Sequence, residues 1–357
     1  MGREDAGVAG ARRAITQLCA GGLPPLELLA AVAERVRRVV PYAAAGWQVI
    51  DPATLLPTGG FAQNVDRATH LQLIDNELTG GDFLTFAEVG RSRTPVATLR
   101  QATAGELTRS TRYRTINAAA GWSDELRTVF RTGATCWGQG CLARTEGEPA
   151  FSTRDAAFLA AIAPSLGAGL RHGLLLDHAR SSEPDAGATG LVVLHDDGSV
   201  EAISDSALEW LGQLPDEGLD LPSVAYEVAR RARLHADTGG TGPLARTRVR
   251  LPSGAWLAIS GSRLRAVGPG AAPRTAVVLE PAKPADLAPL IVQAYQLSPR
   301  EREITEMLVR GLPLTQIAST LWLSQYTVRD HVKAIYAKLG VRSRPELTAM
   351  LFHEHYA

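Results

Sequence analysis

The chain has 357 residues, of which 45% are hydrophobic and 21% charged, so it is long enough for two or three domains that each bury a core. Its 37 basic and 37 acidic side chains cancel, which excludes a protein drawn to nucleic acid by its overall field, so any DNA binding must be local. Three cysteines are an odd count for a disulfide framework, and without a signal peptide or a long apolar window we expect a cytoplasmic protein that does not enter the membrane.

The first part of the chain carries the pattern of a helix, a mostly antiparallel sheet and a closing helix. Pro25 suits the first turn of an amphipathic helix, and Asp66 can cap a second one. Four strands are expected, over residues 43–50, 55–62, 126–131 and 135–144. Ser152 or Thr153 can cap the closing helix, whose apolar side carries Phe158, Leu159, Ile162, Leu166, Leu170 and Leu174.

This order of elements resembles a GAF sensory domain over residues 12–178. The resemblance rests on the order and on the segment Phe151-Ser-Thr-Arg-Asp-Ala-Ala-Phe-Leu159, where a strand end meets a helix cap and an acidic first turn. It implies an α+β domain that senses a small molecule or a protein. The aromatic residues that could line a ligand cavity include Trp47, Phe61, Trp122 and Trp137, although aromatics at such spacings are more often ordinary core.

A seam rich in Pro, Gly and charge over residues 181–190 precedes a second module. Short strands should flank the tight turn Asp196-Asp-Gly-Ser199, and Ser204 or Asp205 can cap the helix that follows. A later helix and three strands are expected over residues 223–235, 245–251, 256–261 and 275–280. The hairpin, its helix and the final three strands resemble a PAS domain over residues 186–282, which implies a second α+β fold.

Residues 281–286 form another expected linker. The sequence after it predicts short helices with clear caps. Ser298 is placed as N-cap, with Pro299 at the first helical position and Glu301 in the first turn, and Gly311 ends this helix. Thr315 should cap a second helix, over residues 316–321. Ser324 should cap a third over residues 325–339, which buries Val328, Val332, Ile335 and Leu339, and Ser343 a fourth.

The amino-acid sequence of residues 297–352 resembles the helix-turn-helix of LuxR/NarL transcriptional regulators. The matching stretches are Leu297-Ser-Pro-Arg-Glu-Arg-Glu-Ile304, Gln316-Ile-Ala318, Leu323-Ser324, Thr327-Val-Arg-Asp-His-Val-Lys333, Lys338-Leu-Gly-Val341 and Ser343-Arg344. The resemblance implies an all-α domain of four helices over residues 290–357, with the third helix in the major groove of double-stranded DNA. The segment Leu312-Pro-Leu-Thr315 departs from the polar segment usual in the family, which puts one backbone contact in doubt.

The resemblance also assigns roles to side chains of the third helix. It implies that Arg329, Asp330 and Lys333 face the bases, and that Thr327 and Lys338 steady the phosphate backbone. The same polar surface carries two further candidates for DNA contacts, Gln325 and Tyr326. A helix with Arg and Lys outside is usually only a solvated face, so these residues indicate DNA binding through the whole pattern and not singly.

A dimer is expected because the C-terminal domain carries little charge. Residues 297–357 hold eight basic and six acidic side chains, a balance of +2, so one copy should bind DNA weakly. We therefore expect a homodimer on a two-fold symmetric promoter site. The resemblance implies a dimer surface on the fourth helix, at Leu347, Met350 and Leu351, and allows RNA polymerase as a further partner.

Other candidate sites are weak. Cys136 and Cys141 lie an odd number of residues apart, so a regular strand would point them to opposite faces, and we interpret them as core or pocket wall. The sequence contains no glycine-rich phosphate loop and no paired zinc motif, so we predict no cofactor and no metal. The acidic cluster of a receiver domain is missing too, which favours control by a ligand or a protein partner.

The sequence thus predicts a multidomain protein: an α+β GAF-like domain, an α+β PAS-like domain and an all-α helix-turn-helix domain. We interpret it as a one-component, sequence-specific transcriptional regulator and not an enzyme. One alternative is an interaction scaffold that has lost DNA binding, against which Arg329 and Lys333 count. The other is a small hydrolase, which would need a nucleophile beside a base that the sequence does not offer.

Overall fold

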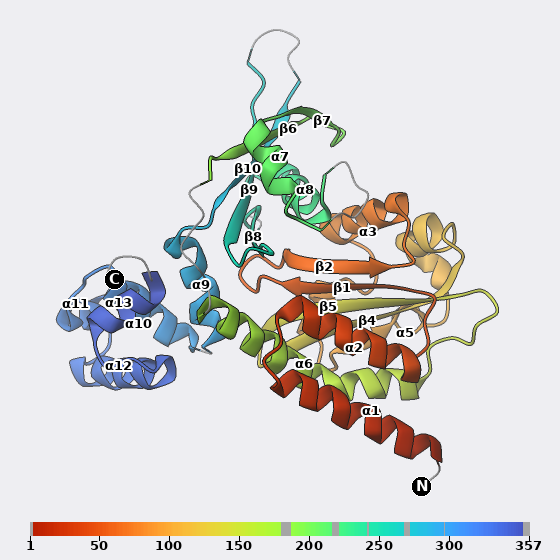
Figure 1. The fold of residues 1–357 in the computed structure, drawn as a ribbon, viewed down its shortest axis with the longest axis horizontal. Coiled ribbons are helices and arrows are strands. Elements are labelled where there is room, and N and C mark those ends of the chain that lie inside the picture. The colour runs from red at the N-terminus through yellow and green to blue at the C-terminus, as the bar shows by residue number, and fades with distance from the viewer. Residues whose placement is uncertain are drawn as a thin grey trace. The chain divides into compact units, whose positions relative to one another are not determined.

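The computed structural model describes residues 3–179, 187–215, 221–240, 243–267, 272–295 and 297–352. Most of the seam at residues 181–190 lies outside these ranges, so its structure is not assigned. The chain divides into two compact units, Met1–Pro281 and Ala282–Ala357 (Figure 1). Unit 1 contains two antiparallel sheets, and the described part of unit 2 is helical.

The first sheet has five antiparallel strands in the order β2-β1-β5-β4-β3. The strands are β1 (Ala44–Ile50), β2 (Pro57–Gln63), β3 (Val96–Thr98), β4 (Trp122–Thr132) and β5 (Thr135–Thr145). The four predicted strands are present, and β4 begins four residues earlier than expected. β3 was missed because three residues are too few to show an alternating pattern.

A bulge in the β4–β5 pair corrects the prediction for the two cysteines. Cys136 pairs with Arg131 and Cys141 with Arg127, while Trp137 is the extra residue between them. Arg127 and Arg131 are four residues apart on one strand, so their partners share a face. The prediction that the cysteines point to opposite faces is therefore wrong. Both thiols are free, and burial raises the pKa of Cys136 to about 11, so it is a poor nucleophile at neutral pH.

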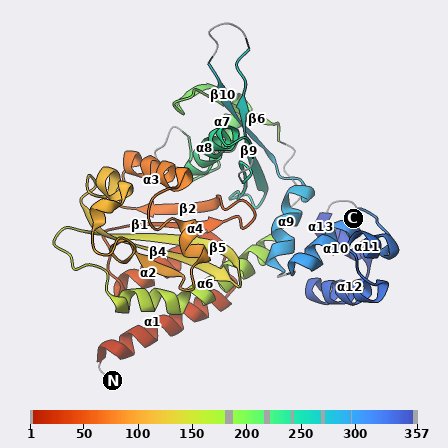
Figure 2. The same ribbon diagram turned by 180° about the vertical axis from the view of Figure 1, so that it is seen from behind.

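Three helices lie along one side of the first sheet: α1 (Arg3–Ala20), α2 (Pro25–Val39) and α6 (Thr153–Ala179) (Figures 1 and 2). Glycines let α6 approach its neighbours, because a Cβ on Gly167 would lie 2.8 Å from the backbone nitrogen of Arg131, and one on Gly169 would lie 2.9 Å from the Cα of Cys19. α1 was not predicted, since two glycines interrupt its apolar spacing.

The opposite side of this sheet carries shorter elements. They are α3 (Arg67–Thr79), α4 (Phe86–Arg91), α5 (Leu99–Ala102), a 3₁₀ turn (Leu107–Arg109) and a π turn (Tyr113–Asn117). Asp66 caps α3 as predicted, accepting a hydrogen bond from the backbone N–H of Thr69. Val129 of β4 packs here with Leu84, Val89 and Leu99.

The second sheet also has five antiparallel strands, in the order β7-β6-β10-β9-β8. They are β6 (Gly190–Leu194), β7 (Val200–Ile203), β8 (Arg246–Arg250), β9 (Trp256–Leu264) and β10 (Arg274–Pro281). Ser204 caps α7 (Asp205–Leu211), and α8 follows at Ser223–Asp237. These elements bury an apolar core that includes Val192, Leu194, Ala225, Val228, Leu257, Ile259, Val277 and Leu279.

Helix α8 contacts both sheet regions of unit 1. Its apolar side packs on β9 and β10, while the other side faces α3. There Asp75 accepts hydrogen bonds from Tyr226 at 3.2 Å and from Arg230 Nε at 2.8 Å. Gln48 of β1 donates to Glu227 at 3.3 Å. Burial and the nearby Asp75 raise the pKa of Tyr226, so the phenol stays a hydrogen-bond donor.

Two edge strands, β2 and β8, join the sheets within unit 1. Arg248 of β8 forms a buried ion pair with Asp51 in the loop before β2. Thr247 donates its hydroxyl to the carbonyl of Pro57 at 2.6 Å, and Leu56 enters the core of the second sheet. The edge strand β2 is thus covered by protein, which removes the hazard of an open sheet edge.

Unit 2 contains α9 (Pro284–Ala294), α10 (Pro299–Val309), α11 (Leu314–Thr320), α12 (Gln325–Leu339) and α13 (Arg344–Phe352). The predicted seam at residues 281–286 runs into α9, which sequence reasoning missed. Thr315 does not cap α11, because the helix begins at Leu314, two residues earlier than expected, with Pro313 as its N-cap. The fixed φ of Pro313, in an extended conformation, sets the start of the helix.

One helix meets the composition test for a membrane span. The stretch Thr153–Asp177 of α6 is long and apolar enough, so the expectation that no window approaches that length is wrong there. Half of the window is buried against the rest of unit 1. A core helix of this kind satisfies the same test, so its composition is explained by packing on β4 and α1.

Candidate nucleic-acid interface

Helix α12 has the bounds that its caps predict. The hydroxyl of Ser324 accepts a hydrogen bond from the backbone N–H of Thr327 at 3.0 Å, and Gly340 ends the helix at φ +70°. The predicted stripe is buried in the core of unit 2: Val328, Val332, Ile335 and Leu339. Because this stripe fixes the rotation of the helix, the polar side chains between its members must face away from the core.

The outer face of α12 presents charged side chains to solvent. Arg329 is exposed and, among the described residues, makes no hydrogen bond or ion pair. Lys333 and Asp330 lie 4.0 Å apart, with exposed fractions of 82% and 52%, so their attraction is weak and screened by salt. The arrangement leaves two cations and one acceptor free to meet a polyanion that also offers hydrogen-bonding base edges.

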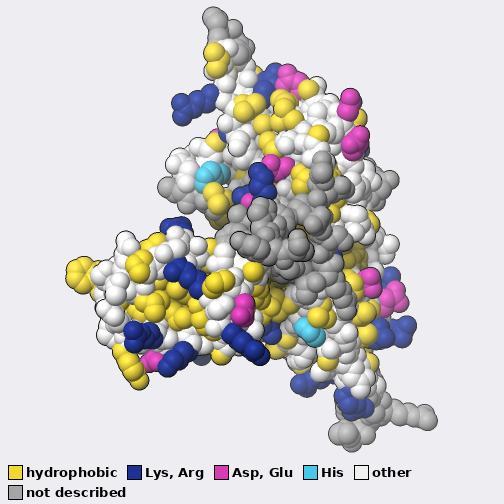
Figure 3. All heavy atoms as spheres, turned by 60° about the vertical axis from the view of Figure 1, so that its left-hand side comes forward, with side chains coloured by type: hydrophobic (Ala, Val, Ile, Leu, Met, Phe, Trp, Pro, Cys, Tyr) yellow, Lys and Arg dark blue, Asp and Glu magenta, His cyan; other side chains and the backbone are white. Residues whose placement is uncertain are grey.

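Figure 3 shows the charge of this unit from one side. Lys and Arg side chains are spread around a band of hydrophobic side chains and do not form one continuous basic patch. This face therefore lacks a broad positive field. Binding to a polyanion would rest on the few cations of α12 and on its neighbours in the fold.

Thr327 and Lys338, the two residues expected to contact phosphate, also have partners inside the protein. The Nζ of Lys338 lies 2.6 Å from a carboxylate oxygen of Glu301, and the hydroxyls of Thr327 and Ser324 are 2.8 Å apart. Glu301 is itself part of the capping box of α10, through Ser298. Burial alone would raise the pKa of Glu301, but the hydrogen bonds from Lys338 and Ser298 outweigh burial and lower it. The carboxylate thus ties α12 to the start of α10.

Two arginines that sequence reasoning left unassigned join the helices of unit 2. Arg344 donates to the carbonyl of Leu308, with Nε at 2.7 Å, and Arg300 donates to the carbonyl of Leu321. Both carbonyls lie at helix C-termini, where the backbone lacks partners of its own. The signal in the sequence is weak, since neither arginine is close to its acceptor along the chain. Their contacts join α10 to α11 and to α13.

The apolar residues of α13 are used inside the unit. Leu347 and Leu351 are buried in the core with Ile304 and Val332, and α9 packs against α13. The expectation that these two leucines form a dimer surface is therefore wrong, because the monomer already buries them. Met350 is only half-buried.

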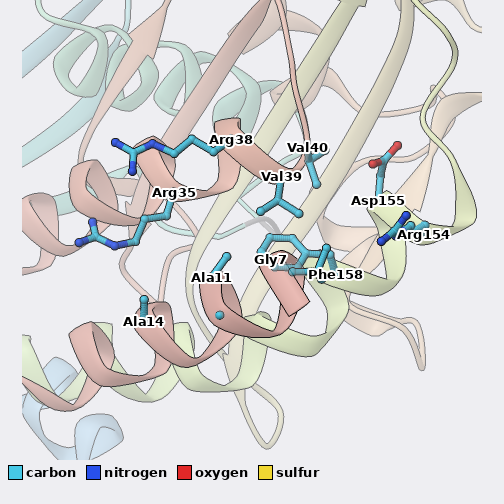
Figure 4. Close-up of a pocket in the computed structure, with 12 residues that line it drawn as sticks. Gly7, Ala11, Ala14, Arg35, Arg38, Val39, Val40, Arg154, Asp155 and Phe158 are labelled. Carbon is cyan, nitrogen blue, oxygen red and sulfur yellow. The ribbon is translucent and has the colours of Figure 1, made fainter. Parts of the chain in front are cut away.

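A second candidate site lies in unit 1, between α1, α2 and the start of α6 (Figure 4). The cleft has a volume of about 640 Å³. Its lining combines small and apolar residues with charged ones: Gly7, Val8, Gly10, Ala11, Ala14, Arg35, Arg38, Val39, Val40, Arg154, Asp155 and Phe158. None of the four aromatics singled out from the sequence lines this cleft. Trp47, Trp122 and Trp137 are buried, with Trp47 stacked on Phe130 at 6.1 Å between ring centroids.

The sheet face opposite α6 holds a buried ionic cluster. Glu125 accepts from Arg112 Nε at 3.0 Å, from Arg127 Nε at 2.5 Å and from Asn117 at 2.7 Å. Arg127 also pairs with Glu77, and its guanidinium stacks on Phe86, 4.5 Å from the ring centroid. The opposing charges and hydrogen bonds compensate for the cost of desolvation here.

Comparison with known proteins bears on unit 2. The family described as "Bacterial regulatory proteins, luxR family" matches residues 295–351. The spore germination protein GerE of Bacillus subtilis (strain 168) is 42% identical over 55 residues, which are 15% of this chain and 74% of GerE. The chain belongs to the luxR family of bacterial regulatory proteins.

Two further relatives match short stretches of this luxR-family chain. The probable HTH-type transcriptional regulator GfsR of Streptomyces halstedii is 50% identical over 50 residues, 14% of this chain and 21% of GfsR. The nitrate/nitrite response regulator protein NarL of Escherichia coli (strain K12) is 39% identical over 59 residues, 16% of this chain and 27% of NarL. The chain thus covers about a quarter or less of these regulators.

The chain shows a loose likeness to solved structures. A GAF domain from a phosphoenolpyruvate-protein phosphotransferase of Coxiella burnetii overlays with a TM-score of 0.34 and 16% sequence identity, covering 49% of this chain and 98% of that one. A score of that size carries no functional assignment, so the sheets of unit 1 are described by their own topology.

Proposed function

We propose that the protein is a sequence-specific DNA-binding transcriptional regulator that reads its site with α12. The observation that carries the proposal is the outer face of this helix, where Arg329 and Lys333 are exposed while the inner stripe is held in the core. Arginine and lysine can pair with guanine in the major groove, and Asp330 can accept from cytosine. Membership of the luxR family supports this use of the helix.

The regulator acts as a homodimer on a two-fold symmetric promoter site. One copy of the domain has a balance of only +2 over residues 297–357, so two copies are needed to hold enough phosphates. With Leu347 and Leu351 buried in the core, the dimer contacts use other side chains, among which Met350 of α13 is only half-buried. Double-stranded DNA and RNA polymerase are the expected partners in the cytoplasm, and the protein neither catalyses a reaction nor enters a membrane.

Unit 1 is the sensory part, with a GAF-like first sheet and a PAS-like second sheet. Both sheets have the same strand order when each is numbered from its own first strand, which supports two related sensory folds. A small molecule or a protein bound to unit 1 shifts the population between arrangements that suit or oppose paired DNA binding. The cleft between α1, α2 and α6, and the cavity predicted beside Trp47, Phe61, Trp122 and Trp137, are the two places where such a ligand is to be sought.

The test is selection of genomic DNA fragments by the full-length protein at a fixed salt concentration. Wild type should enrich a short symmetric motif, and the Arg329→Ala, Lys333→Ala double variant should not. Arg12→Ala, Arg13→Ala removes the same charge from exposed positions on α1 and should keep the motif. If wild type enriches no motif, or if the α12 variant enriches the same one, the proposal is wrong.

A further inference from the structure

Trp322 differs from the other tryptophans of this chain in its exposure to solvent. Trp322 lies in the turn between α11 and α12 with 94% of its surface exposed. The other five tryptophans are at most 7% exposed: Trp47, Trp122, Trp137, Trp210 and Trp256. Burying an indole is strongly favourable, so an indole held in water at the entrance to α12 is available to a partner.

The backbone at Trp322 is one that normally calls for glycine. The N–H of Leu323 bonds to the carbonyl of Ala318 at 2.9 Å, and the N–H of Trp322 to that of Ser319 at 3.3 Å. These two bonds are the Schellman motif that ends a helix, and Trp322 takes its left-handed position at φ +54°. A side chain with a Cβ is strained in that region.

The same unit shows the unstrained version of this motif. At the end of α10 the N–H of Leu312 bonds to Met307 and that of Gly311 to Leu308, and the left-handed position is filled by Gly311 at φ +91°. The two helix ends have the same hydrogen bonds, one with glycine and one with tryptophan. Tertiary packing cannot explain the choice at Trp322, since its side chain is almost wholly in water.

The residues around Trp322 indicate which kind of partner its side chain contacts. Tyr326, 75% exposed, follows in the first turn of α12, which also leads to Arg329. From Gly311 to Val328 the sequence contains no charged side chain. If the N-terminal end of α12 enters a groove of DNA, the turn itself can contribute only neutral groups. The cation that reaches this turn, Arg300 at the carbonyl of Leu321, is already paired with Glu303 at 2.8 Å. An indole suits this task, because it offers an apolar face and one N–H donor.

We propose that Trp322 contacts the sugar–phosphate wall of the major groove beside α12, with its ring on a deoxyribose and its N–H donated to a phosphate oxygen. This inference rests on the proposed DNA-binding function and adds a contact that the family resemblance does not assign. The contact is uncharged and displaces no cation from the DNA. It therefore contributes to affinity without contributing to the salt dependence of binding.

The experiment measures DNA affinity of the full-length protein over a series of salt concentrations, together with thermal unfolding. Trp322→Gly should weaken binding to the selected site about tenfold, as expected for one neutral contact. The slope of log affinity against log salt should stay unchanged, and the melting temperature should stay equal or rise, because glycine relieves the left-handed strain. Trp322→Asn, which also tolerates this conformation, should behave in the same way.

Two controls separate this contact from its neighbours. Lys333→Ala should weaken binding and also lower the salt slope by about 1, as a phosphate or base cation does. Leu244→Ala removes an exposed apolar side chain in unit 1 and should change neither quantity. Subtracting the fluorescence emission spectrum of Trp322→Phe from that of wild type leaves the emission of Trp322. The selected DNA should alter this difference spectrum.

The outcomes distinguish the inference from the function on which it rests. If wild type selects a DNA site but Trp322→Gly binds it equally well, the contact is wrong and the DNA-binding function stands. Loss of transcription without loss of affinity would assign Trp322 to a protein partner and overturn the inference. A lowered melting temperature in Trp322→Gly would make the residue structural and overturn it too. If wild type selects no DNA, it is the proposed function that fails.

Discussion

The first sheet of unit 1 runs β2-β1-β5-β4-β3 and the second β7-β6-β10-β9-β8, so each has the same order when numbered from its own first strand. Their interiors differ. The first sheet buries Arg112, Glu125 and Arg127 in a hydrogen-bonded ionic cluster. The corresponding layer beneath α7 and α8 in the second sheet is an apolar core, with Leu257 and Val277 fully buried.

The difference teaches that one strand order can be stabilised in two ways. An apolar core tolerates a lost contact in proportion to the volume removed. A buried ionic cluster depends on every partner, because removing one charge leaves its neighbours desolvated and unpaired. The first sheet should therefore be the more sensitive of the two to changes of charge and of pH.

Removing Glu125 is the strongest way to test this contrast. Glu125→Ala leaves the guanidinium groups of Arg112 and Arg127 buried without their shared carboxylate, and should lower the free energy of unfolding of unit 1 by about 3–5 kcal/mol. Urea unfolding followed by tryptophan fluorescence measures the loss. Leu257→Ala in the second sheet is the comparison variant, with an expected loss of about 2–5 kcal/mol from the cavity alone.

A second set of substitutions distinguishes the Glu125→Ala loss from the Leu257→Ala loss. Adding Arg112→Met, Arg127→Met and Glu77→Gln to Glu125→Leu should recover part of the lost stability, because the paired charges of the cluster are then removed together. No charge change in the first sheet should rescue Leu257→Ala. If Glu125→Ala is as stable as wild type, the cluster does not hold the first sheet together.

Acidification is the second test of the contrast. Burial works to raise the pKa of Glu125, but Arg112 and Arg127 outweigh it, so its pKa lies below the ordinary value. Hydrogen bonds from the backbone of Arg112 and from Ser110 likewise lower the pKa of Asp82 against burial. For a lowered pKa the stabilisation is present above the unfolded value, about 4.3 for Glu, and is lost as the pH falls towards the folded value.

Unit 1 should consequently lose stability below about pH 4, by about 1.4 kcal/mol for each unit of pKa difference. Glu125→Gln should flatten this dependence, whereas Leu257→Ala should shift stability by the same amount at every pH. Urea unfolding at a series of pH values gives both curves. Equal slopes in wild type and Glu125→Gln would contradict the assignment.

The contact between the sheets gives an intermediate effect. Asp51 and Arg248 are both buried where β2 meets β8. A double-mutant cycle with Asp51→Ala and Arg248→Ala should give a coupling energy of about 2 kcal/mol that survives high salt, because buried pairs are poorly screened. A coupling near zero would mean that this ion pair does not hold β2 to β8, and that Leu56 and the hydrogen bond from Thr247 to Pro57 do.

Local signals explain why much of the fold could be predicted. Ser298, Ser324 and Asp66 are caps that act within three residues, and the helices they begin start where expected. The outer face of α12 follows from its inner stripe in the same way. Elements with few residues or little periodicity, such as β3 and α4, gave no such signal.

Pairings between distant residues could not be predicted. Arg112 meets Glu125 only because the segment before the π turn folds against β4, and Arg248 lies 197 residues from Asp51 along the chain. Lys338 shows the same limit at the candidate interface, since its ion pair with Glu301 spans 37 residues. Charge in a sequence does not say whether a side chain will face solvent, DNA or a partner inside the fold.

The smallest expected effect concerns the second junction of the two sheet regions, between α3 and α8. Asp75 and Arg230 lie 2.8 Å apart but are partly exposed, at 41% and 23%. A cycle with Asp75→Ala and Arg230→Ala should give a coupling of about 0.5 kcal/mol that disappears in 1 M salt, where the Debye length is about 3 Å. The same cycle at Asp51 and Arg248 should not change with salt. If the α3–α8 pair proves the stronger of the two, then α8, and not the β2–β8 edge, is what holds the two sheets to each other.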